Sequence, residues 1–478
     1  MASAPAHGSP PAAPDPRRWR ALTVCLVAGF MALLDVTIVN VALPSIEVGL
    51  DARDEDLQWI VSGYALAFGV VLGLAGRIGD ARGRRRVFLV GVAAFTLASV
   101  ASGLASTAGV LVATRAVQGL AGGVVTPQIS GLIQQLFQGA ERGRAFGWFG
   151  ATVGVSTAVG PSLGGLLIHL GGPVDGWRWV FFVNVPIGVA AIALGARLLP
   201  PDARGQASRQ RLDVVGMLLL GTGVLLVLVP VIEQQWRGPT RWLSTAGGIA
   251  VLAGFWAWER RYARTGEPAV DVGLFRRRSY ALGCLLGMFY FAGFTAVPFV
   301  LSLFLQQGYG YSALATGLTL TPFALGSAVA AALSGRIVTR VGRPLVAAGL
   351  VTVGVGVAAT ALVVELVPGR SAPWAVAPAL LLAGLGSGTV ISPNITLTLS
   401  EVPVRRAGSA GGVLQTAQRV GAAAGIALAG TVLFARLGVT GDWGSAFGHA
   451  VTVTLVLVAA ALATALTDIG ATRRARLR

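Results

Sequence analysis

One acidic residue lies well inside a long apolar run near the start of the chain. The run extends from Ala21 to Leu43, and the segment LLDVTIVNVALP, from Leu33 to Pro44, contains Asp35. A carboxylate at such a depth in a membrane-spanning helix costs several kcal/mol unless it is protonated, paired or facing a wet cavity. Carboxyl groups kept in apolar surroundings are candidates for reversible proton binding. Asp35 is therefore the first candidate for chemistry in this chain.

Arg115 is the natural partner of this acid. It lies in a second apolar run, and a guanidinium does not lose its proton at ordinary pH, so Arg115 needs acceptors. An arginine that approached Asp35 in one conformation and left it in another would change the proton affinity of the acid. Two interpretations stay open. Either the pair binds and releases a proton as it separates and rejoins, or Asp35 is structural, satisfied by Thr37 or permanently paired with Arg115. In the structural interpretation, Arg115 also bonds Gln118.

Four further polar residues in apolar runs are candidates for a substrate cavity, because polar groups inside a membrane face a bundle interior more often than lipid. They are Asn40, Gln118, Gln415 and Arg419. For Arg419, helix packing remains the alternative to substrate contact.

The composition places these residues in a membrane. The chain has 478 residues, of which 54% are hydrophobic and only 12% charged. A bilayer-spanning helix needs about 20 apolar residues. Fourteen runs of that kind are expected, at residues 21–43, 57–76, 87–106, 108–130, 145–170, 178–198, 213–233, 243–259, 280–305, 312–334, 345–366, 374–397, 409–435 and 446–467. The fold class is therefore an all-α integral membrane protein with 14 transmembrane helices.

The arginines predict the orientation of these helices. All 37 positive charges are arginines, and 29 of them fall in segments that share one side of the membrane with both termini, against six on the other side. Basic residues favour cytoplasmic loops, so both the N- and C-termini are expected in the cytoplasm. Because the arginines are dispersed in this way, the net charge of +17 is explained by membrane topology and by contact with anionic lipid headgroups. No nucleic-acid partner is predicted.

Two short segments repeat. The segment GRIGDARGRR, from Gly76 to Arg85, matches GRIVTRVGRP, from Gly335 to Pro344, in register at Gly, Arg, Ile, Gly and Arg. Each follows the second span of its part of the chain, which is the pattern of an internally duplicated carrier. The predicted organisation is a cytoplasmic tail at 1–20, an N-terminal six-helix half at 21–198, an inserted helix pair with linkers at 199–279, a C-terminal six-helix half at 280–467 and a basic tail at 468–478.

Five motifs in sequence order resemble the Major Facilitator Superfamily, and within it the fourteen-helix drug:proton antiporters of the EmrB/QacA type. They are LLDVTIVNVALP, GRIGDARGRRR, RAVQG, GVSTAVGPSLGG and WRWVFFVNVPIG. The resemblance implies proton-coupled export by alternating access, with Asp35 and Arg115 in proton coupling. The chain departs from the family pattern in two places. Ala81 replaces the usual basic residue after the loop aspartate, and the tenth span has no acid, whereas some relatives that handle dicationic drugs carry one there. The second argues against divalent organic cations as substrates.

The loop after the second span is the candidate cytoplasmic gate. Its residues Gly76, Asp80, Gly83, Arg84 and Arg85 combine glycines that permit a tight turn with charges that can pair. Asp80 could bond a helix end or an arginine when the gate is shut. The alternative is that Asp80 only caps the third span.

The fifth span carries the motif that the resemblance assigns to exporters. Its residues Gly154, Gly160, Pro161, Gly164 and Gly165 predict close contact with another helix and a bend, because glycine lets backbones approach and proline removes a backbone donor. A sliding seam and simple tight packing both fit this spacing.

No enzymatic motif accompanies these residues. The chain has three scattered histidines, no HExxH, no CxxC and no P-loop, so neither an enzyme, a metal site nor a cofactor is predicted. The predicted function is a proton-coupled exporter of lipophilic drug-like compounds in the bacterial cell (inner) membrane. Its partners are a small-molecule substrate, protons and lipid; we expect a monomer and leave a periplasmic adaptor open. The alternatives are a dedicated exporter of one natural product, and a sensor built on a transporter fold.

Overall fold

The computed structural model describes residues 16–172, 174–202, 213–232, 239–266, 268, 270, 272–367 and 372–477. Most of the predicted N-terminal tail and the linker at 203–212 lie outside this part of the chain. Within it, the secondary structure is entirely helical. The apolar runs fold as helices because a chain in lipid must satisfy its backbone hydrogen bonds internally.

The first half contains seven helical segments, α1 (Arg18–Leu50), α2 (Asp54–Arg82), α3 (Arg84–Gly103), α4 (Ala108–Leu136), α5 (Gly139–Gly171), α6 (Gly176–Phe182) and α7 (Asn184–Leu198). The short α6 and α7 together form one apolar segment, Gly176–Leu198. Helix α5 bends by 45° between Thr157 and Ser162. Pro161 lies in this interval, where its missing amide proton explains a bend; its side-chain contacts are outside those described.

The second half contains α10 (Arg278–Leu303), α11 (Ala313–Val341), α12 (Arg343–Leu366), α13 (Ala372–Ala375), α14 (Ala377–Thr398), α15 (Ala407–Thr440) and α16 (Trp443–Leu477). Three short helical turns accompany them: η1 (Val272–Arg276) precedes α10, η2 (Phe304–Gly308) follows α10, and η3 (Val404–Arg406) precedes α15. In the described residues, 11 helices are long and apolar enough to cross a membrane, or up to 12 if the bent α5 is one span. These correspond to the two predicted six-helix halves.

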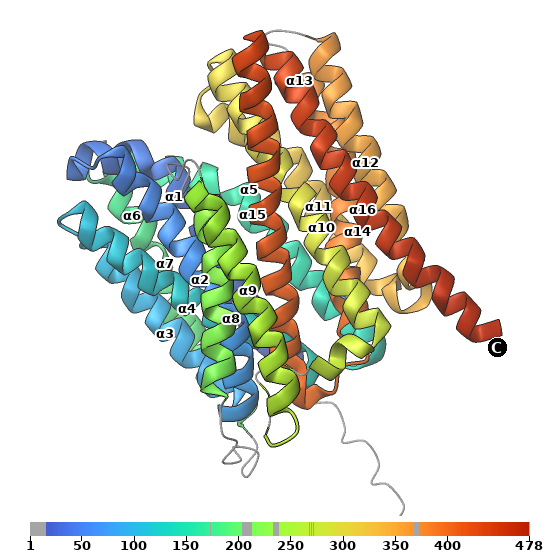
Figure 1. Cartoon of the computed structure of the whole chain (residues 1–478). Coiled ribbons are helices and arrows are strands. Elements are labelled where there is room, and N and C mark those ends of the chain that lie inside the picture. The colour runs from blue at the N-terminus through green and yellow to red at the C-terminus, as the bar shows by residue number, and fades with distance from the viewer. Residues whose placement is uncertain are drawn as a thin grey trace, which may run out of the picture.

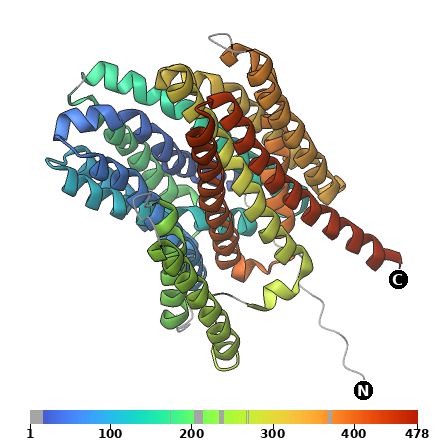
Figure 2. The same ribbon diagram turned by 45° about the horizontal axis from the view of Figure 1, so that its top comes forward.

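Helices α8 (Val214–Ile232) and α9 (Pro239–Tyr262) occupy the predicted inserted pair. They pack on each other and project to one side of the bundle, as Figure 2 shows in green. Leu220 and Val224 of α8 pack with Val70 of α2 and with Val413 and Val420 of α15. The pair therefore covers the line along which these two helices meet. Its described apolar stretch, Val214–Val227, is shorter than the other spans.

The two halves lie side by side (Figure 1) and meet through two equivalent helix pairs, α2 with α15 and α5 with α11. The repeated glycines make both contacts possible. A Cβ atom on Gly76 would overlap the carbonyl oxygen of Gly408, and one on Gly335 would overlap that of Gly143. The sequence repeat thus marks two seams related by the duplication, in which the second helix of each half touches the fifth helical span of the other.

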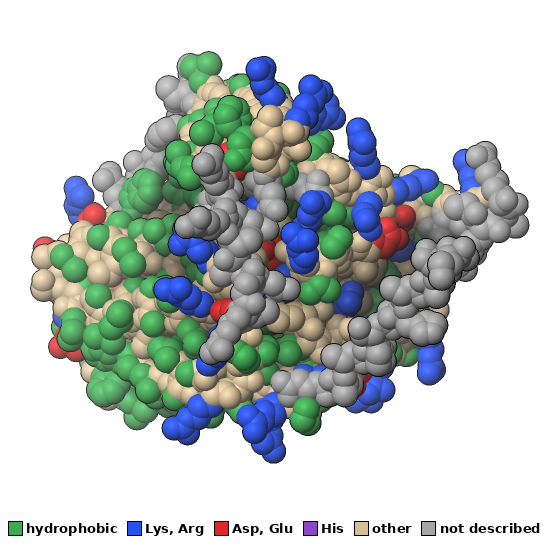
Figure 3. All heavy atoms as spheres, turned by 90° about the horizontal axis from the view of Figure 1, so that it is seen from below, with side chains coloured by type: hydrophobic (Ala, Val, Ile, Leu, Met, Phe, Trp, Pro, Cys, Tyr) green, Lys and Arg blue, Asp and Glu red, His purple; other side chains and the backbone are tan. Residues whose placement is uncertain are grey.

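Both seams lie near the end of the bundle that carries the α2–α3 turn at Gly83 and the α11–α12 turn at Gly342. We call this end the arginine-rich end, because its loops hold most of the arginines. Figure 3 looks onto it and shows these side chains in blue. Gly83 and Gly342 have φ angles of 100° and 70°, a conformation that glycine adopts without strain and that allows each turn to be tight.

We predict that Gly76→Leu loosens the arginine-rich end. The new side chain would overlap the α15 backbone, and overpacking costs about 1–3 kcal/mol. A thiol introduced by Ser409→Cys, which is only 5% exposed, should then react with a maleimide about tenfold faster in detergent. The native Cys25 and Cys284 are buried and give little background.

The matched control is Gly109→Leu, because no atom lies within 4 Å of a Cβ at that glycine. Equal labelling rates in Gly76→Leu and Gly109→Leu would contradict the close α2–α15 contact.

Candidate functional site

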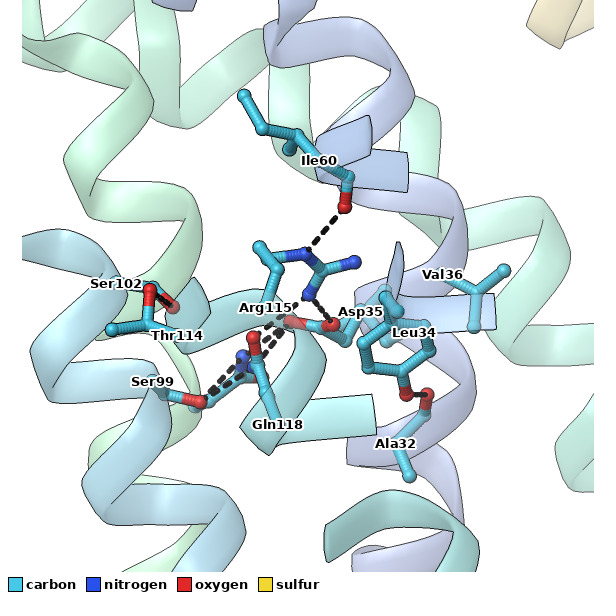
Figure 4. A network of polar contacts seen from close by, with 12 residues as sticks. Ala32, Leu34, Asp35, Val36, Ile60, Ser99, Ser102, Thr114, Arg115 and Gln118 are labelled. Atoms are coloured by element: carbon cyan, nitrogen blue, oxygen red, sulfur yellow. Dashed lines mark hydrogen bonds and ion pairs between the residues drawn. The ribbon is translucent and has the colours of Figure 1, made fainter. Parts of the chain in front are cut away.

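Asp35 is completely buried in α1, and three side chains donate to its carboxylate. Arg115 of α4 forms an ion pair with Oδ2. Oδ1 accepts hydrogen bonds from Nε2 of Gln118 and from Nδ2 of Asn184, each at 2.9 Å. Figure 4 shows Asp35, Arg115 and Gln118 converging from α1 and α4. A buried charge pair persists only when further hydrogen bonds satisfy it, and this site supplies them.

The guanidinium of Arg115 is held on several sides. Its Nε donates to the carbonyl oxygen of Ile60 at 3.2 Å, and its Nη1 donates to Oε1 of Gln118 at 2.8 Å. Its carbon lies 4.1 Å from the centre of the Tyr64 ring, a cation–π contact. In the described residues, Arg115 therefore pairs with the acid that the sequence suggested.

Two residues of this network had no role in the sequence analysis. Ser99 accepts from Nε2 of Gln118 at 2.8 Å, and Asn184 lies within 3.4 Å of the same hydroxyl. Asn184 begins α7, at the break after α6, and belongs to the quoted motif WRWVFFVNVPIG. The sequence feature that could have drawn attention to Asn184 is an amide side chain inside an apolar run.

The four candidates for a substrate cavity do not gather in one place. Gln118 belongs to the Asp35 network. Asn40 is exposed, and its side chain donates to the carbonyl oxygen of Val36 in its own helix at 3.3 Å. Gln415 and Arg419 lie one turn apart on α15, on a face that looks towards the first half, where Gln415 donates to Ser130 of α4 at 3.2 Å.

Asp80, in the candidate gate loop, joins the two halves. Its side chain is 1% exposed, and its oxygens accept hydrogen bonds from the backbone N–H groups of Gly408 at 3.0 Å and Ser409 at 2.8 Å. These groups belong to the first turn of α15, where a helix favours negative charge. Asp80 therefore caps a helix of the opposite half, and we call this contact the latch.

Arg84 reinforces the latch. It forms an ion pair with Asp80 at 2.8 Å, and it donates to the carbonyl oxygens of Gly131 in α4, at 2.9 Å, and of Val404 beside α15. A different acid, Asp202, accepts from the backbone N–H groups of Arg85 and Arg86 in the first turn of α3. Of the two roles considered for Asp80, the described contacts show the cap across the halves.

We predict that Asp80→Asn weakens this cap. Asparagine keeps an acceptor but loses the charge, which is worth about 1–2 kcal/mol at a helix N-terminus in a partly buried site. Amide hydrogen exchange at Gly408 and Ser409 should accelerate about tenfold, because opening of this turn becomes easier.

The matched control is Asp202→Asn, which removes an exposed acid that caps α3 within one half. It should accelerate exchange at Arg85 and Arg86 alone. Protection at Ser409 that is unchanged by Asp80→Asn would show that the cap contributes nothing.

The exporter motif in α5 contacts two helices. A Cβ on Gly154 would come within 2.9 Å of the Ala324 carbonyl oxygen in α11. Within the bend, a Cβ on Gly160 would overlap Oγ1 of Thr37, and beyond it a Cβ on Gly164 would lie 2.9 Å from Cγ1 of Ile38. The same helix therefore touches the opposite half with one portion and the Asp35-bearing helix with another.

Thr37 adds a direct bond to this contact. Its hydroxyl lies 3.0 Å from the carbonyl oxygen of Leu34 and 3.3 Å from that of Ser156 in α5. Thr37 was an alternative partner for Asp35, but its described contacts are with these backbone oxygens. The α1–α5 contact therefore begins two residues from the buried acid.

We predict that Gly164→Leu abolishes transport while the protein remains in the membrane, because a larger side chain would push α5 from Ile38. Gly165→Leu is the matched control, since a Cβ at Gly165 meets no atom within 4 Å. Transport by both variants should be compared in vesicles at equal protein content. Equal activity of the two would refute a role for the α1–α5 contact.

Comparison with known proteins agrees with this architecture. The family model described as "Major Facilitator Superfamily" matches residues 25–426. The solved human organic anion transporter MFSD10 has a TM-score of 0.68 at 16% identity and covers 94% of this chain and 100% of that one. The proton:xylose symporter XylE has a TM-score of 0.66 at 15% identity and covers 92% and 94%. These two likenesses show the fold.

Curated relatives are closer in sequence. The chain is 39% identical to the probable actinorhodin transporter of Streptomyces coelicolor over 91% of this chain and 75% of that protein. It is 38% identical to the puromycin resistance protein pur8 of Streptomyces alboniger, over 88% and 82%, and 35% identical to the tetracenomycin C resistance and export protein of Streptomyces glaucescens, over 88% and 77%. This chain belongs to the Major Facilitator Superfamily and is a multi-pass transporter of the bacterial cell membrane.

Proposed function

We propose that this chain exports lipophilic, drug-like compounds in exchange for protons, and that Asp35 is the acid that binds the proton. The observation that carries the proposal is the buried Asp35–Arg115 pair. Relatives named for export of, or resistance to, antibiotics supply the direction and the kind of cargo. Within the superfamily, the motifs favour the fourteen-helix drug:proton antiporter branch.

The orientation follows from the arginines. Basic residues favour cytoplasmic loops, so we assign the arginine-rich end and both termini to the cytoplasm. Helices α8 and α9 then form the two additional spans. Because one chain supplies both halves, a monomer is sufficient for this activity.

The contacts suggest how proton binding would reach the gate. Asp35 must exchange its pairing with Arg115 for a proton, which shifts α1 relative to α4. Helix α1 contacts α5 through Thr37 and Ile38, and α5 contacts α11 through Gly154. A movement at Asp35 would therefore be transmitted to the seam between the halves. Since the latch and both glycine seams hold the arginine-rich end together, we assign this structure to a state closed towards the cytoplasm.

The test uses inside-out vesicles with an imposed proton gradient. A panel of lipophilic cations, neutral antibiotics and anionic metabolites is added while the gradient is monitored. Wild type should release protons when a substrate is added, and Asp35→Asn should not, because asparagine cannot bind the proton. The control is Asp175→Asn, whose acid forms an exposed ion pair with Arg178 and should leave the response unchanged.

Full proton release in Asp35→Asn would show that Asp35 is not the acid that binds the transported proton. The number of compounds that cause proton release decides between broad and narrow substrate specificity. Several unrelated compounds would indicate a multidrug exporter. A response to one compound would indicate a dedicated exporter of a natural product, as the names of the actinorhodin and tetracenomycin C relatives suggest.

A further inference from the structure

Arg419 is a cation within the membrane-spanning part of α15 that has no anionic partner in the described residues. It forms neither a hydrogen bond nor an ion pair there. Its described contact is with Phe68 of α2, whose ring centre lies 4.8 Å from the guanidinium carbon. By contrast, Arg115, which also lies deep inside a span, is paired with Asp35. A charged group in the bilayer ordinarily has a partner or marks a substrate pathway.

The guanidinium of Arg419 is not completely enclosed by protein. The side chain is only partly buried, and its nitrogen atoms are not among the sealed polar atoms of the described residues. Gln415, one turn earlier, bonds Ser130 of α4, so this face of α15 points to the junction between the two halves. The hydrogen-bond donors of Arg419 are therefore available to a molecule that enters between the halves.

The Phe68 ring that Arg419 contacts is held in place by its neighbours. The Phe68 ring stacks on Tyr64, with ring centres 5.9 Å apart and planes at 25°. The Tyr64 hydroxyl donates to the carbonyl oxygen of Ala32 at 3.0 Å, and the opposite cation, Arg115, lies 4.1 Å from the Tyr64 ring. The two rings thus lie between the two guanidinium groups. A cation fixed in this way loses little freedom on binding an anion.

The depth of Arg419 restricts what the anion can be. Arg419 lies twelve residues after the start of α15, which corresponds to about 18 Å along the helix, near the middle of a hydrocarbon core of about 30 Å. A lipid headgroup stays at the membrane surface. The anion must instead be one that reaches the middle of the bundle, as a transported substrate does.

We propose that Arg419 binds the anionic group of the substrate, and that the substrates include lipophilic organic anions such as aromatic carboxylates. This inference rests on the proposed function. A planar guanidinium matches a carboxylate with two parallel hydrogen bonds, and the apolar surroundings accept the lipophilic body of the molecule. Because an anion leaving and a proton entering both move positive charge inwards, export of such a substrate is electrogenic.

The test compares three probes that differ only in charge: anthracene carboxylate, anthracene methanol and anthracene methylamine, all substituted at the same ring position. Their binding to the purified full-length protein is measured by fluorescence in buffer without chloride, and again with chloride added. Wild type should bind the carboxylate at least about tenfold more tightly than the alcohol, since a charge-assisted bidentate pair is worth about that factor or more.

Arg419→Gln should lose this preference, and Arg419→Lys should retain part of it. Arg436→Gln is the control, because it removes an exposed arginine from the same helix. Equal carboxylate affinity in wild type and Arg419→Gln would overturn the proposal. So would binding of chloride at Arg419 that the carboxylate does not compete with. Neutral compounds still exported with Asp35-dependent proton flux would then leave the proposed function standing.

Discussion

The buried pair of Asp35 and Arg115 is the constraint around which the first half is arranged. Two opposite charges withdrawn from water are tolerable only if further hydrogen bonds hold the charged groups themselves. Four helical segments meet this demand, because α1 provides the acid, α4 provides Arg115 and Gln118, α3 provides Ser99 and α7 provides Asn184. Asn184 lies at the break between α6 and α7, within hydrogen-bonding distance of Asp35. A charge change at Asp35 therefore affects the packing of several helices at once.

The bent helix α5 connects this pair to the second half. On one side of the bend its glycines contact α1 beside Asp35, and on the other side they contact α11. The latch at Asp80 lies at the equivalent seam, between α2 and α15. The two seams are related by the duplication, yet only the first carries the acid, because Thr339 occupies the position of Asp80 in the second repeat. Closure at the arginine-rich end therefore combines a symmetric glycine contact with an asymmetric charged one.

Sequence patterns predicted much of this arrangement where the signal is local. The repeated glycine and arginine spacing predicted two halves, and the position of Asp35 within its apolar run singled out an acid that is buried. Gln118 was considered both for the substrate cavity and as a partner of Arg115, which it follows by three residues on the same helix face, and the structure shows the second contact. Asn184 could at most be noticed as an amide in an apolar run, and its pairing with Asp35 could not be predicted. The partners of Asp80 are backbone N–H groups far away in the chain, which carry no sequence pattern.

The measurement that tests the central claim most directly is infrared difference spectroscopy of the purified protein between acidic and alkaline buffer. If Asp35 binds and releases a proton, wild type will show a protonated-carboxyl band in acid that disappears in alkali and is absent from Asp35→Asn. If wild type and Asp35→Asn give the same carboxyl spectra, Asp35 remains permanently paired with Arg115. In that case the pair is a structural element and the proton is carried elsewhere.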